Sequence, residues 1–308
     1  MNSSTSAQGD TRADRALSSR HGLDTEPVIH VRGLSKSYGD ALAVDAVDLD
    51  VNRGEIFVML GPNGAGKTTT VEILEGHRQR TAGTVSVLGV DPSRGNRAWR
   101  ARLGLVLQSM SGFEDFTVRE VVRHFAGYYA DPYPADEVIS LVGLTPERGK
   151  RTKVLSGGQR RRLDVALGIV GRPELLFLDE PTTGFDPEAR LDFWALLTSL
   201  AAGGTTMVLT THYLHEAEAL ADRVAVMKAG RIIAMGSIAT LSADVDHAEV
   251  SWIEDGLRQS VVTRTPTVTV VETARRLGGE IPDLSIARPS LEEIYLRMIG
   301  STRYGVES

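Results

Sequence analysis

The sequence contains no cysteine, which excludes disulfide bonds, cysteine-ligated zinc and thiol catalysis, and is compatible with a reducing cytoplasm. No uninterrupted apolar run approaches the ~20 residues that a membrane-spanning helix needs, so any membrane association must come through a partner or the surface. Basic residues are not in excess, because 34 Lys and Arg stand against 40 Asp and Glu, and a net charge of -6 argues against a dedicated nucleic-acid binder. The composition is typical of a globular protein with an ample core, because 42% of the 308 residues are hydrophobic and 24% are charged.

The first 26 residues also lack an apolar block. They are rich in Ser, Thr, Ala, Arg and Asp. A secretory signal needs an apolar region of roughly 7–15 residues, which this segment does not have. We therefore expect residues 1–26 to form a disordered tail.

Four short apolar runs without alternation predict strands that are buried on both faces of a parallel sheet. The runs are Ile56–Leu60, Leu103–Leu107, Leu175–Leu178 and Met207–Leu209. Helical patterns separate them, so the fold class is α/β, and ligands in such sheets bind beyond the carboxyl ends of the strands. We expect the residues that follow the runs to meet in one crevice. These residues are Gly61, Gln108, Asp179 and the triplet Thr210, Thr211 and His212.

Other patterns surround this sheet. Val28–Val51 alternates apolar and polar residues around a Tyr-Gly-Asp turn, which predicts antiparallel strands, and Val224–Met235 has the pattern of a hairpin that turns at Ala229-Gly230. Residues 109–172 show helical periodicity with little strand signal, which predicts a helical subdomain. Together these segments define a core domain over residues 27–240.

A small α+β accessory domain is predicted for residues 241–308. Its pattern begins with a strand-like AEVSWI segment. A second alternating run through Thr267–Val271 predicts another strand that passes into a helix, and the closing SLEEIYLRMIG segment has the pattern of an amphipathic helix.

The segment GPNGAGKTT matches the phosphate-binding pattern G-x-x-x-x-G-K-[ST] between a buried strand and a helix, as the motif requires. Its glycines allow backbone N–H groups to wrap the phosphates, Lys67 neutralises phosphate charge, and the Thr68 hydroxyl is a ligand for Mg²⁺. The residues assigned to nucleotide binding here are Gly61, Pro62, Asn63, Gly64, Ala65, Gly66, Lys67, Thr68 and Thr69.

Two adjacent carboxylates follow the apolar strand LLFLD. Asp179 at the strand's end is expected to hold Mg²⁺ through water, and Glu180 is expected to orient and deprotonate the attacking water. The alternative interpretation is a helix cap or a solvated turn.

Three further side chains are candidates for contacts with the nucleotide. His212 is expected to donate to the γ-phosphate, and Gln108 to reach Mg²⁺ or the attacking water. The Tyr38 ring is expected to stack on adenine, the alternative being that it packs against the strand turn. His212 and His215 do not complete a metal-binding HExxH arrangement, so a histidine metal site is not predicted.

A second anion site is predicted at the segment LSGGQ. Ser156 followed by two glycines leaves backbone N–H groups bare at the start of a helix, where the helix dipole favours anions. The following run Arg160–Arg162 is interpreted as a solvated helix face beside a polyphosphate. Since a complete phosphate-binding loop lies upstream, the second anion site requires an explanation.

Taken together, Tyr38, GPNGAGKTT, Gln108, LSGGQ, LLFLDEP, GFDP and His212 resemble the nucleotide-binding subunit of an ATP-binding cassette (ABC) transporter over roughly Val28 to Ser237. The resemblance implies a P-loop ATPase core that uses ATP and Mg²⁺, with an antiparallel β subdomain and a helical subdomain. It also implies a head-to-tail homodimer in which the LSGGQ segment of one copy faces the γ-phosphate held by Lys67 of the other. The residues that the resemblance places at this shared interface are Ser156, Gly157, Gly158, Gln159 and Asp186.

The resemblance further implies an integral membrane permease, contacted by the region after Gln108, with Phe113 and Phe116 as candidate contacts. Phe185 stands where the family most often has Leu, and we expect a packing change without loss of function. The segment PSLEEIYL resembles the closing motif of daunorubicin-resistance-type exporter ATPases, which work with a separate ABC-2-type permease at the cytoplasmic face of the membrane.

The leading hypothesis is therefore an ATPase that drives efflux of a small hydrophobic compound, with no nucleic-acid partner. An importer or a lipid or polysaccharide exporter would use the same motifs. An ATPase that acts on ribosomes or DNA is disfavoured by the single cassette and the lack of sustained heptads, and a kinase is disfavoured by LSGGQ and the acid pair.

Overall fold

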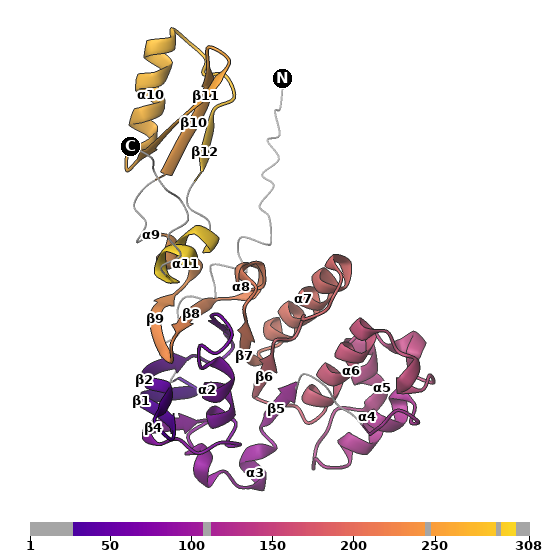
Figure 1. Cartoon of the computed structure of the whole chain (residues 1–308). Helices are drawn as coiled ribbons and strands as arrows, with labels where there is room; N and C mark the ends of the chain where they lie inside the picture. Colours follow the sequence, from indigo (N-terminus) through magenta and orange to yellow (C-terminus); the bar gives the residue numbers. More distant parts are fainter. Residues whose placement is uncertain (1–26, 107–111, 244–247, 288–290, 300–308) are drawn as a thin grey trace, which may run out of the picture.

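The computed structural model describes residues 27–106, 112–243, 248–287 and 291–299. Its centre is a six-stranded sheet with the strand order β5-β6-β7-β3-β8-β9 (Figure 1). Neighbouring strands are parallel except at one edge, where β9 is antiparallel to β8. The strands are β3 (Ile56–Leu60), β5 (Leu103–Val106), β6 (Leu175–Asp179), β7 (Thr206–Thr211), β8 (Arg223–Lys228) and β9 (Arg231–Gly236).

The prediction of a buried parallel sheet is confirmed. All side chains of β3 and β7 are buried, as are the first four of β6. The order of the strands matters for the site, because β7 lies between β6 and β3 and the carboxyl ends of these three strands therefore adjoin. The predicted hairpin is β8–β9, and its turn residues Ala229 and Gly230 both have positive φ, as a two-residue hairpin turn needs.

A three-stranded antiparallel sheet, β2-β1-β4, packs beside the main sheet. Its strands are β1 (Ile29–Tyr38), β2 (Ala41–Val51) and β4 (Ala82–Val87). The antiparallel pairing of β1 with β2 confirms the strand prediction for Val28–Val51. Their inward side chains share a core with Phe57 and Met59 of β3 and with helix α2 (Lys67–Leu74).

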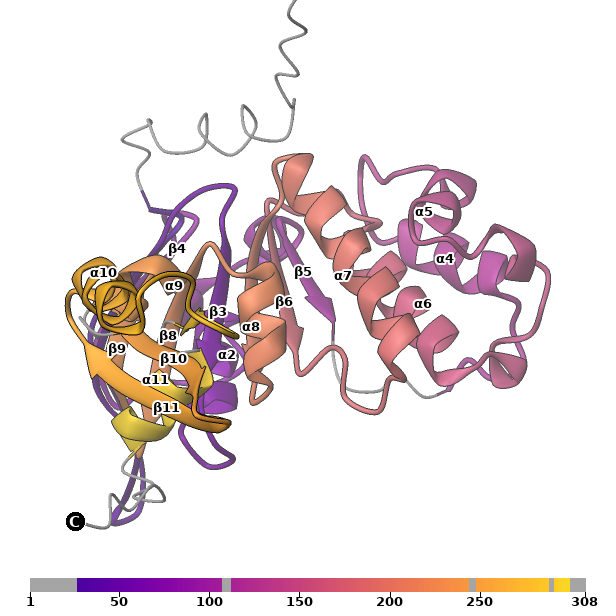
Figure 2. The same cartoon turned by 90° about the horizontal axis from the view of Figure 1, so that it is seen from above.

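Helices α4, α5 and α6 form one end of the molecule, away from the small antiparallel sheet (Figure 2). They lie within residues 112–172, where the sequence shows helical periodicity. Helix α6 packs against β5, and α8 packs against β3 and β7. The helices are α3 (Arg97–Arg100), α4 (Val118–Ala126), α5 (Ala135–Leu141), α6 (Gly157–Ile169), α7 (Pro187–Ala202) and α8 (Leu214–Leu220), with 3-10 turns at Pro92–Arg94, Thr145–Glu147 and Thr152–Val154.

The C-terminal part is an α+β unit followed by a helix that returns to the main core. Its elements are α9 (Ile238–Ala243), β10 (Ala248–Glu254), β11 (Leu257–Thr263), α10 (Pro266–Leu277), β12 (Ser285–Ala287) and α11 (Leu291–Ile299). The strand predicted for AEVSWI is β10, and the predicted closing helix is α11. Helix α11 contacts α9 and α8. Tyr295 on α11 and Leu241 on α9 both belong to the large core cluster, so the chain beyond residue 240 contributes to that core.

One strand prediction in this unit is wrong. The alternating run Thr267–Val271 lies within α10, which begins at Pro266. Val270, Ala274 and Leu277 follow helical spacing and pack against the buried core of the C-terminal sheet, which has the strand order β11-β10-β12. The burial of this helical stripe, together with a proline at the first helical position, outweighs the strand preference of the β-branched residues.

None of the helices in the described part of the chain is long and apolar enough to span a bilayer. The predicted tail, residues 1–26, lies outside the described residues.

Candidate nucleotide-binding site

A cavity of about 480 Å³ opens at the phosphate-binding loop, which connects β3 to α2. Two glycines in the loop are required by close backbone approaches. A Cβ on Gly61 would lie 2.4 Å from the Met227 carbonyl oxygen, and one on Gly66, which has a φ of +102°, would lie 2.5 Å from the Ala43 carbonyl oxygen. The residues that line the cavity are Ala43, Asn63, Gly64, Ala65, Gly66, Lys67, Thr68, Thr69 and Glu180.

Lys67 supplies a buried positive charge inside this loop. Its Nζ donates to the carbonyl oxygens of Gly61 at 2.6 Å and Pro62 at 3.2 Å, and the residue is 5% exposed. Burial lowers the pKa of the Lys67 amine, while the negative charges of Glu180 and Asp179 act in the opposite direction. The ammonium and the bare N–H groups at the start of α2 suit the cavity to anionic phosphates.

The two carboxylate residues at the end of β6 are both tied to Thr210 of β7. The parallel register pairs Asp179 with Thr210, whose Oγ1 donates to Asp179 Oδ1. The backbone N–H of Glu180 donates to both Thr210 O and Thr210 Oγ1, each at 3.1 Å. Glu180 has a φ of +43°, a left-handed conformation that costs a non-glycine residue roughly 1–2 kcal/mol.

His212 follows β7 and reaches the same place. Its Nδ1 lies 3.1 Å from Glu180 Oε1, and Thr183 Oγ1 donates to the other carboxylate oxygen at 3.4 Å. The structure therefore brings Lys67, Asp179, Glu180 and His212 to the adjoining carboxyl ends of β3, β6 and β7, where the sequence predicts the crevice.

Apart from the LSGGQ residues, three predicted site residues lie elsewhere or outside the described chain. Gln108 is not among the described residues. Tyr38 is 43% exposed and does not line the cavity; Lys36 Nζ and Arg78 Cζ lie 5.0 Å and 5.3 Å from its ring centroid. Asp186 is the N-cap of α7, where its Oδ1 accepts from the backbone N–H of the residue three positions on, at 2.8 Å.

The LSGGQ segment forms the start of α6 and contributes no residue to the lining of the cavity. Ser156 and Gln159 form a capping box: Ser156 Oγ accepts from the Gln159 N–H at 3.2 Å, and Gln159 Oε1 accepts from the Ser156 N–H at 3.0 Å. The two N–H groups between them belong to Gly157 and Gly158. A Cβ added to Gly157 would touch nothing within 4 Å, so the fold of the single chain does not itself require glycine there.

The loop between β6 and α7 is anchored in the core behind the site. Phe185 packs edge-on against the buried Phe193, with ring centroids 5.4 Å apart. The fully buried Glu216 of α8 accepts a hydrogen bond from Thr182 Oγ1 at 2.9 Å, and burial raises the pKa of the Glu216 carboxyl. Neither Thr182 nor Glu216 is predicted from the sequence, because neither belongs to a pattern that indicates chemistry.

The interpretation of Arg160–Arg162 as a solvated face is wrong for its middle residue. Arg160 is exposed, but Arg161 is only 6% exposed and lies 3.7 Å from the buried carboxylate of Asp164. A run of three identical charges gives no local sign of which one points inward. The opposite charge three residues later, one helical turn away, is the signal that could have indicated the buried pair.

Comparisons with known proteins show what the chain resembles. The ABC transporter family model matches residues 44–183. A daunorubicin resistance ATP-binding protein of Streptomyces coeruleorubidus is 39% identical over 90% of this chain and 98% of its own length. A Nod factor export ATP-binding protein of Rhizobium sp. is 37% identical over 88% of this chain and 97% of its own length.

Solved structures share the fold. The structure of an ATP-binding subunit of an ABC transporter has a TM-score of 0.66 at 22% identity and covers 88% of this chain and 99% of its own. A dimeric post-hydrolysis state of an ATP-binding cassette bound to ADP and Pi has a TM-score of 0.61 at 23% identity, over 68% of this chain and 98% of its own.

Proposed function

The chain belongs to the ABC transporter family and is one of its ATPases, and we propose that it powers export of a small hydrophobic compound through a separate ABC-2-type permease. The observation that carries this proposal is the similarity to a daunorubicin resistance ATP-binding protein over 98% of that protein's length. Such a match extends beyond the cassette motifs, which all ATPases of this type share.

The cavity at the phosphate-binding loop is the proposed ATP site. The N–H groups of Gly64, Gly66 and Thr68 and the ammonium of Lys67 bind the phosphates, since they supply the positive charge that lines the cavity. His212, which lies within hydrogen-bonding distance of Glu180, donates to the γ-phosphate.

The chain's oxygen ligands fit Mg²⁺ held jointly with the phosphates. The described residues contain no cluster of three His, Cys, Asp or Glu side chains that could hold a metal by themselves. A hydroxyl from Thr68 and a carboxylate from Asp179 are hard oxygen donors, and Mg²⁺ normally combines one or two such ligands with phosphate oxygens and water. When bound, the ion neutralises charge that develops on the phosphates. Gln108 is proposed as a further ligand or a contact to the attacking water.

Glu180 is the proposed general base. Its carboxylate lines the cavity, and it contacts His212 and Thr183 through different oxygens. A base in this position takes the proton of the water that attacks the γ-phosphate, and its loss costs about 10²–10⁴ in rate. The Tyr38 ring is exposed and is proposed to stack on the adenine of the bound nucleotide.

The second anion site at α6 supports a head-to-tail dimer. The Gly157 and Gly158 N–H groups and the hydroxyl of Ser156 belong to a helix end that lines no part of this chain's own cavity. We assign them to the γ-phosphate of a second copy, with Gln159 and Asp186 at the same interface. ATP then joins the two subunits, and hydrolysis separates them.

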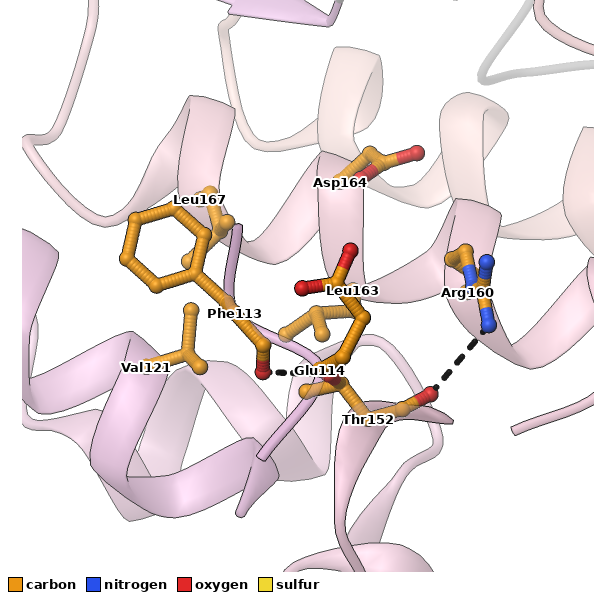
Figure 3. Close-up of a pocket in the computed structure, with 8 residues that line it drawn as sticks. All are labelled: Phe113, Glu114, Val121, Thr152, Arg160, Leu163, Asp164 and Leu167. Atoms are coloured by element: carbon orange, nitrogen blue, oxygen red, sulfur yellow. Dashed lines mark hydrogen bonds between the residues drawn. The ribbon is translucent and has the colours of Figure 1, made fainter. Parts of the chain in front are cut away.

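The membrane partner is proposed to bind beside Phe113. There a small pocket of about 30 Å³ lies between α4, α6 and the loop that carries Phe113 (Figure 3). Phe113 packs edge-on against Phe116 and Phe125, and Phe116 is 50% exposed. An exposed aromatic group of this kind suits a helix of a permease on the cytoplasmic side of the membrane.

Dimer formation is tested in a Glu180→Gln protein, which is expected to bind Mg-ATP but to hydrolyse it about 10²–10⁴ times more slowly than wild type. Size-exclusion chromatography with light scattering should show a dimer with Mg-ATP and a monomer with ADP. Adding Ser156→Tyr should leave ATP binding intact and abolish the dimer, whereas Asn96→Tyr, which removes the cap of α3 instead, should not. A protein that stays monomeric under all these conditions would contradict the proposed head-to-tail dimer.

A second candidate function is export of a different cargo with the same ATPase. It is favoured by the relative named for Nod factor export, which matches this chain over nearly the same length as the drug-resistance relative. The two are separated by isolating the membrane protein that co-purifies with the chain and measuring daunorubicin efflux in cells. Efflux that requires both proteins and is lost with Glu180→Gln supports drug export; equal drug accumulation with wild type and Glu180→Gln contradicts it.

A further inference from the structure

Arg161 is the one of the three consecutive arginines on α6 that is buried, and its guanidinium is directed at the segment Asp179–Pro181, where β6 ends and the loop to α7 begins. Its Nε donates to the carbonyl oxygen of Pro181 at 2.9 Å, and its Nη2 donates to the carbonyl oxygen of Asp179 at 2.9 Å. A buried guanidinium is unfavourable unless it is paired and hydrogen-bonded, and Asp164 supplies the opposite charge at 3.7 Å. These contacts therefore offset the cost of burying the Arg161 charge, and they fix the directions of its N–H groups.

The two carbonyl groups that Arg161 binds belong to the residues on either side of Glu180. The peptide unit between Asp179 and Glu180 is held at both ends, because its carbonyl accepts from Arg161 and its N–H donates to Thr210. Its geometry needs such support, since Glu180 has a φ of +43°. A left-handed conformation of a non-glycine residue persists only where the surrounding structure holds it.

We propose that Arg161 is a positioning residue that fixes the peptide units around Glu180 and so aims the Glu180 carboxylate at the cavity. This inference rests on the proposed function, in which Glu180 is the general base. A planar guanidinium suits the task, because it donates in two fixed directions at once. Without it, the loop relaxes toward an ordinary backbone conformation and the carboxylate turns away from His212.

The position of Arg161 on α6 links the segment Asp179–Pro181 to two other surfaces. Ser156, at the open end of the same helix, lies five residues earlier, about 7 Å along the axis. Asp164, the partner of Arg161, lines the pocket beside Phe113 (Figure 3). A shift of α6 when a phosphate reaches Ser156, or when a partner fills the pocket, thus moves the donor that holds Glu180.

The test compares Arg161→Lys with wild type in steady-state ATPase kinetics, ATP binding and urea unfolding. Lysine keeps the charge beside Asp164 but does not donate to both carbonyls as a fork. We expect kcat to fall by about 10- to 100-fold, as for a misplaced catalytic group. The ATP Kd should stay within about twofold, because Arg161 does not line the cavity.

Arg223→Gln is the matched control. Arg223 also donates to a backbone carbonyl, that of Asp50 at 3.0 Å, and pairs with the buried Glu55 at 3.1 Å, but it lies at the amino end of β8. This substitution should lower the urea midpoint without changing kcat. A folded Arg161→Lys protein whose kcat is within about twofold of the wild-type value, or no lower than that of Arg223→Gln, overturns the proposal.

Epistasis distinguishes positioning from a structural role. Because Arg161 acts through Glu180, Arg161→Lys should cause no further loss of rate in a Glu180→Gln background, whereas an independent loss in that background contradicts the proposal. If Glu180→Gln alone keeps wild-type turnover, the assignment of the base fails instead. Should Arg161→Lys not fold, Arg161→Gln is measured in the same way, and failure of both to fold overturns the positioning role in favour of a structural one.

Discussion

The buried carboxyl of Asp164 makes a quantitative prediction about how the stability of the protein depends on pH. Burial raises the pKa of Asp164 from 3.8 to about 6, although Arg161 and Arg160 act to lower it. The side chain is 7% exposed, so solvent does little to screen this effect. At about 1.36 kcal/mol per pKa unit, the difference between the unfolded and folded values corresponds to about 3 kcal/mol.

The sign follows from proton binding. The folded protein holds the Asp164 proton more tightly than the unfolded chain, so between about pH 4 and pH 6 the folded state binds more protons. The free energy of unfolding therefore falls as the pH rises through this window. Between about pH 4.5 and pH 7.5 the free energy of unfolding should fall by about 2 kcal/mol, out of the full effect of about 3 kcal/mol. The remainder is already lost below about pH 4.5, because the Asp164 carboxyl of the unfolded chain is mostly ionised at that pH.

Asp164→Asn removes this titration while keeping the shape of the protonated acid. Urea unfolding is followed by tryptophan fluorescence at several pH values and constant ionic strength, without nucleotide. The free energy of unfolding of wild type minus that of Asp164→Asn should fall by about 2 kcal/mol from about pH 4.5 to pH 7.5. Any constant cost of weakening the pair with Arg161 cancels in this comparison.

The control is Asp192→Asn. Asp192 also pairs with an arginine, Arg162, at 3.3 Å, but its side chain is 67% exposed. An exposed pair contributes about 0–1 kcal/mol to stability. The free energy of unfolding of wild type minus that of Asp192→Asn should therefore change by less than about 0.5 kcal/mol over the same pH range. If the difference between wild type and Asp164→Asn changes with pH as little as this control does, the reasoning about the burial of Asp164 is refuted.

Three further predictions test other parts of the structure. Gly66→Ala should weaken ATP binding more than about tenfold by calorimetry, because its Cβ would lie 2.5 Å from the Ala43 carbonyl oxygen at a φ of +102°; unchanged affinity would contradict the close approach. Thr210→Val should lower the free energy of unfolding by about 1.5–3 kcal/mol, since it removes a buried donor to the Asp179 carboxylate, and a loss below about 0.5 kcal/mol would show that this bond contributes little. Tyr295→Ala should cost about 3 kcal/mol in the unfolding of the cassette core, whereas a loss confined to a separate transition would show that α11 is not part of that core.

The parallel sheet and the place of the crevice could be predicted from the sequence because burial on both faces leaves a clear pattern. Leu175–Asp179 shows this: an unbroken apolar run ends in a carboxylate at the edge where ligands bind. The choice between helix and strand was harder in the C-terminal unit. Thr267–Val271 alternates as a strand would, yet its conformation depends on packing against a small sheet formed by residues before and after it in the chain.

The partners of Asp179 and Glu180, the proposed Mg²⁺ ligand and the proposed general base, could not be predicted, because they are contacts between distant elements. Thr210 is separated from Asp179 by 31 residues and Arg161 by 18, and they meet because β7 pairs with β6 and α6 packs against β5, the next strand of the sheet. A sequence pattern identifies a residue by its neighbours in the chain. The peptide unit between Asp179 and Glu180 is held by Arg161 and Thr210, which are neighbours of Glu180 only in space.

The two anion sites proposed for the chain differ in a way that the proposed dimer explains. The site at α2 is closed around a lysine whose ammonium already bonds to two carbonyl groups of the loop, and it is complete enough to form a cavity. At the start of α6, the backbone N–H groups of Ser156 and Gln159 are already bonded to each other's side chains. Only the N–H groups of the two glycines between them are left for a ligand. A helix end that has so few donors and lines no part of that cavity binds a phosphate well only if another surface supplies the remaining charge. In the proposed head-to-tail dimer, the α2 site of a second copy supplies that charge, and the glycine at position 157, which the chain's own packing does not require, keeps the approach clear.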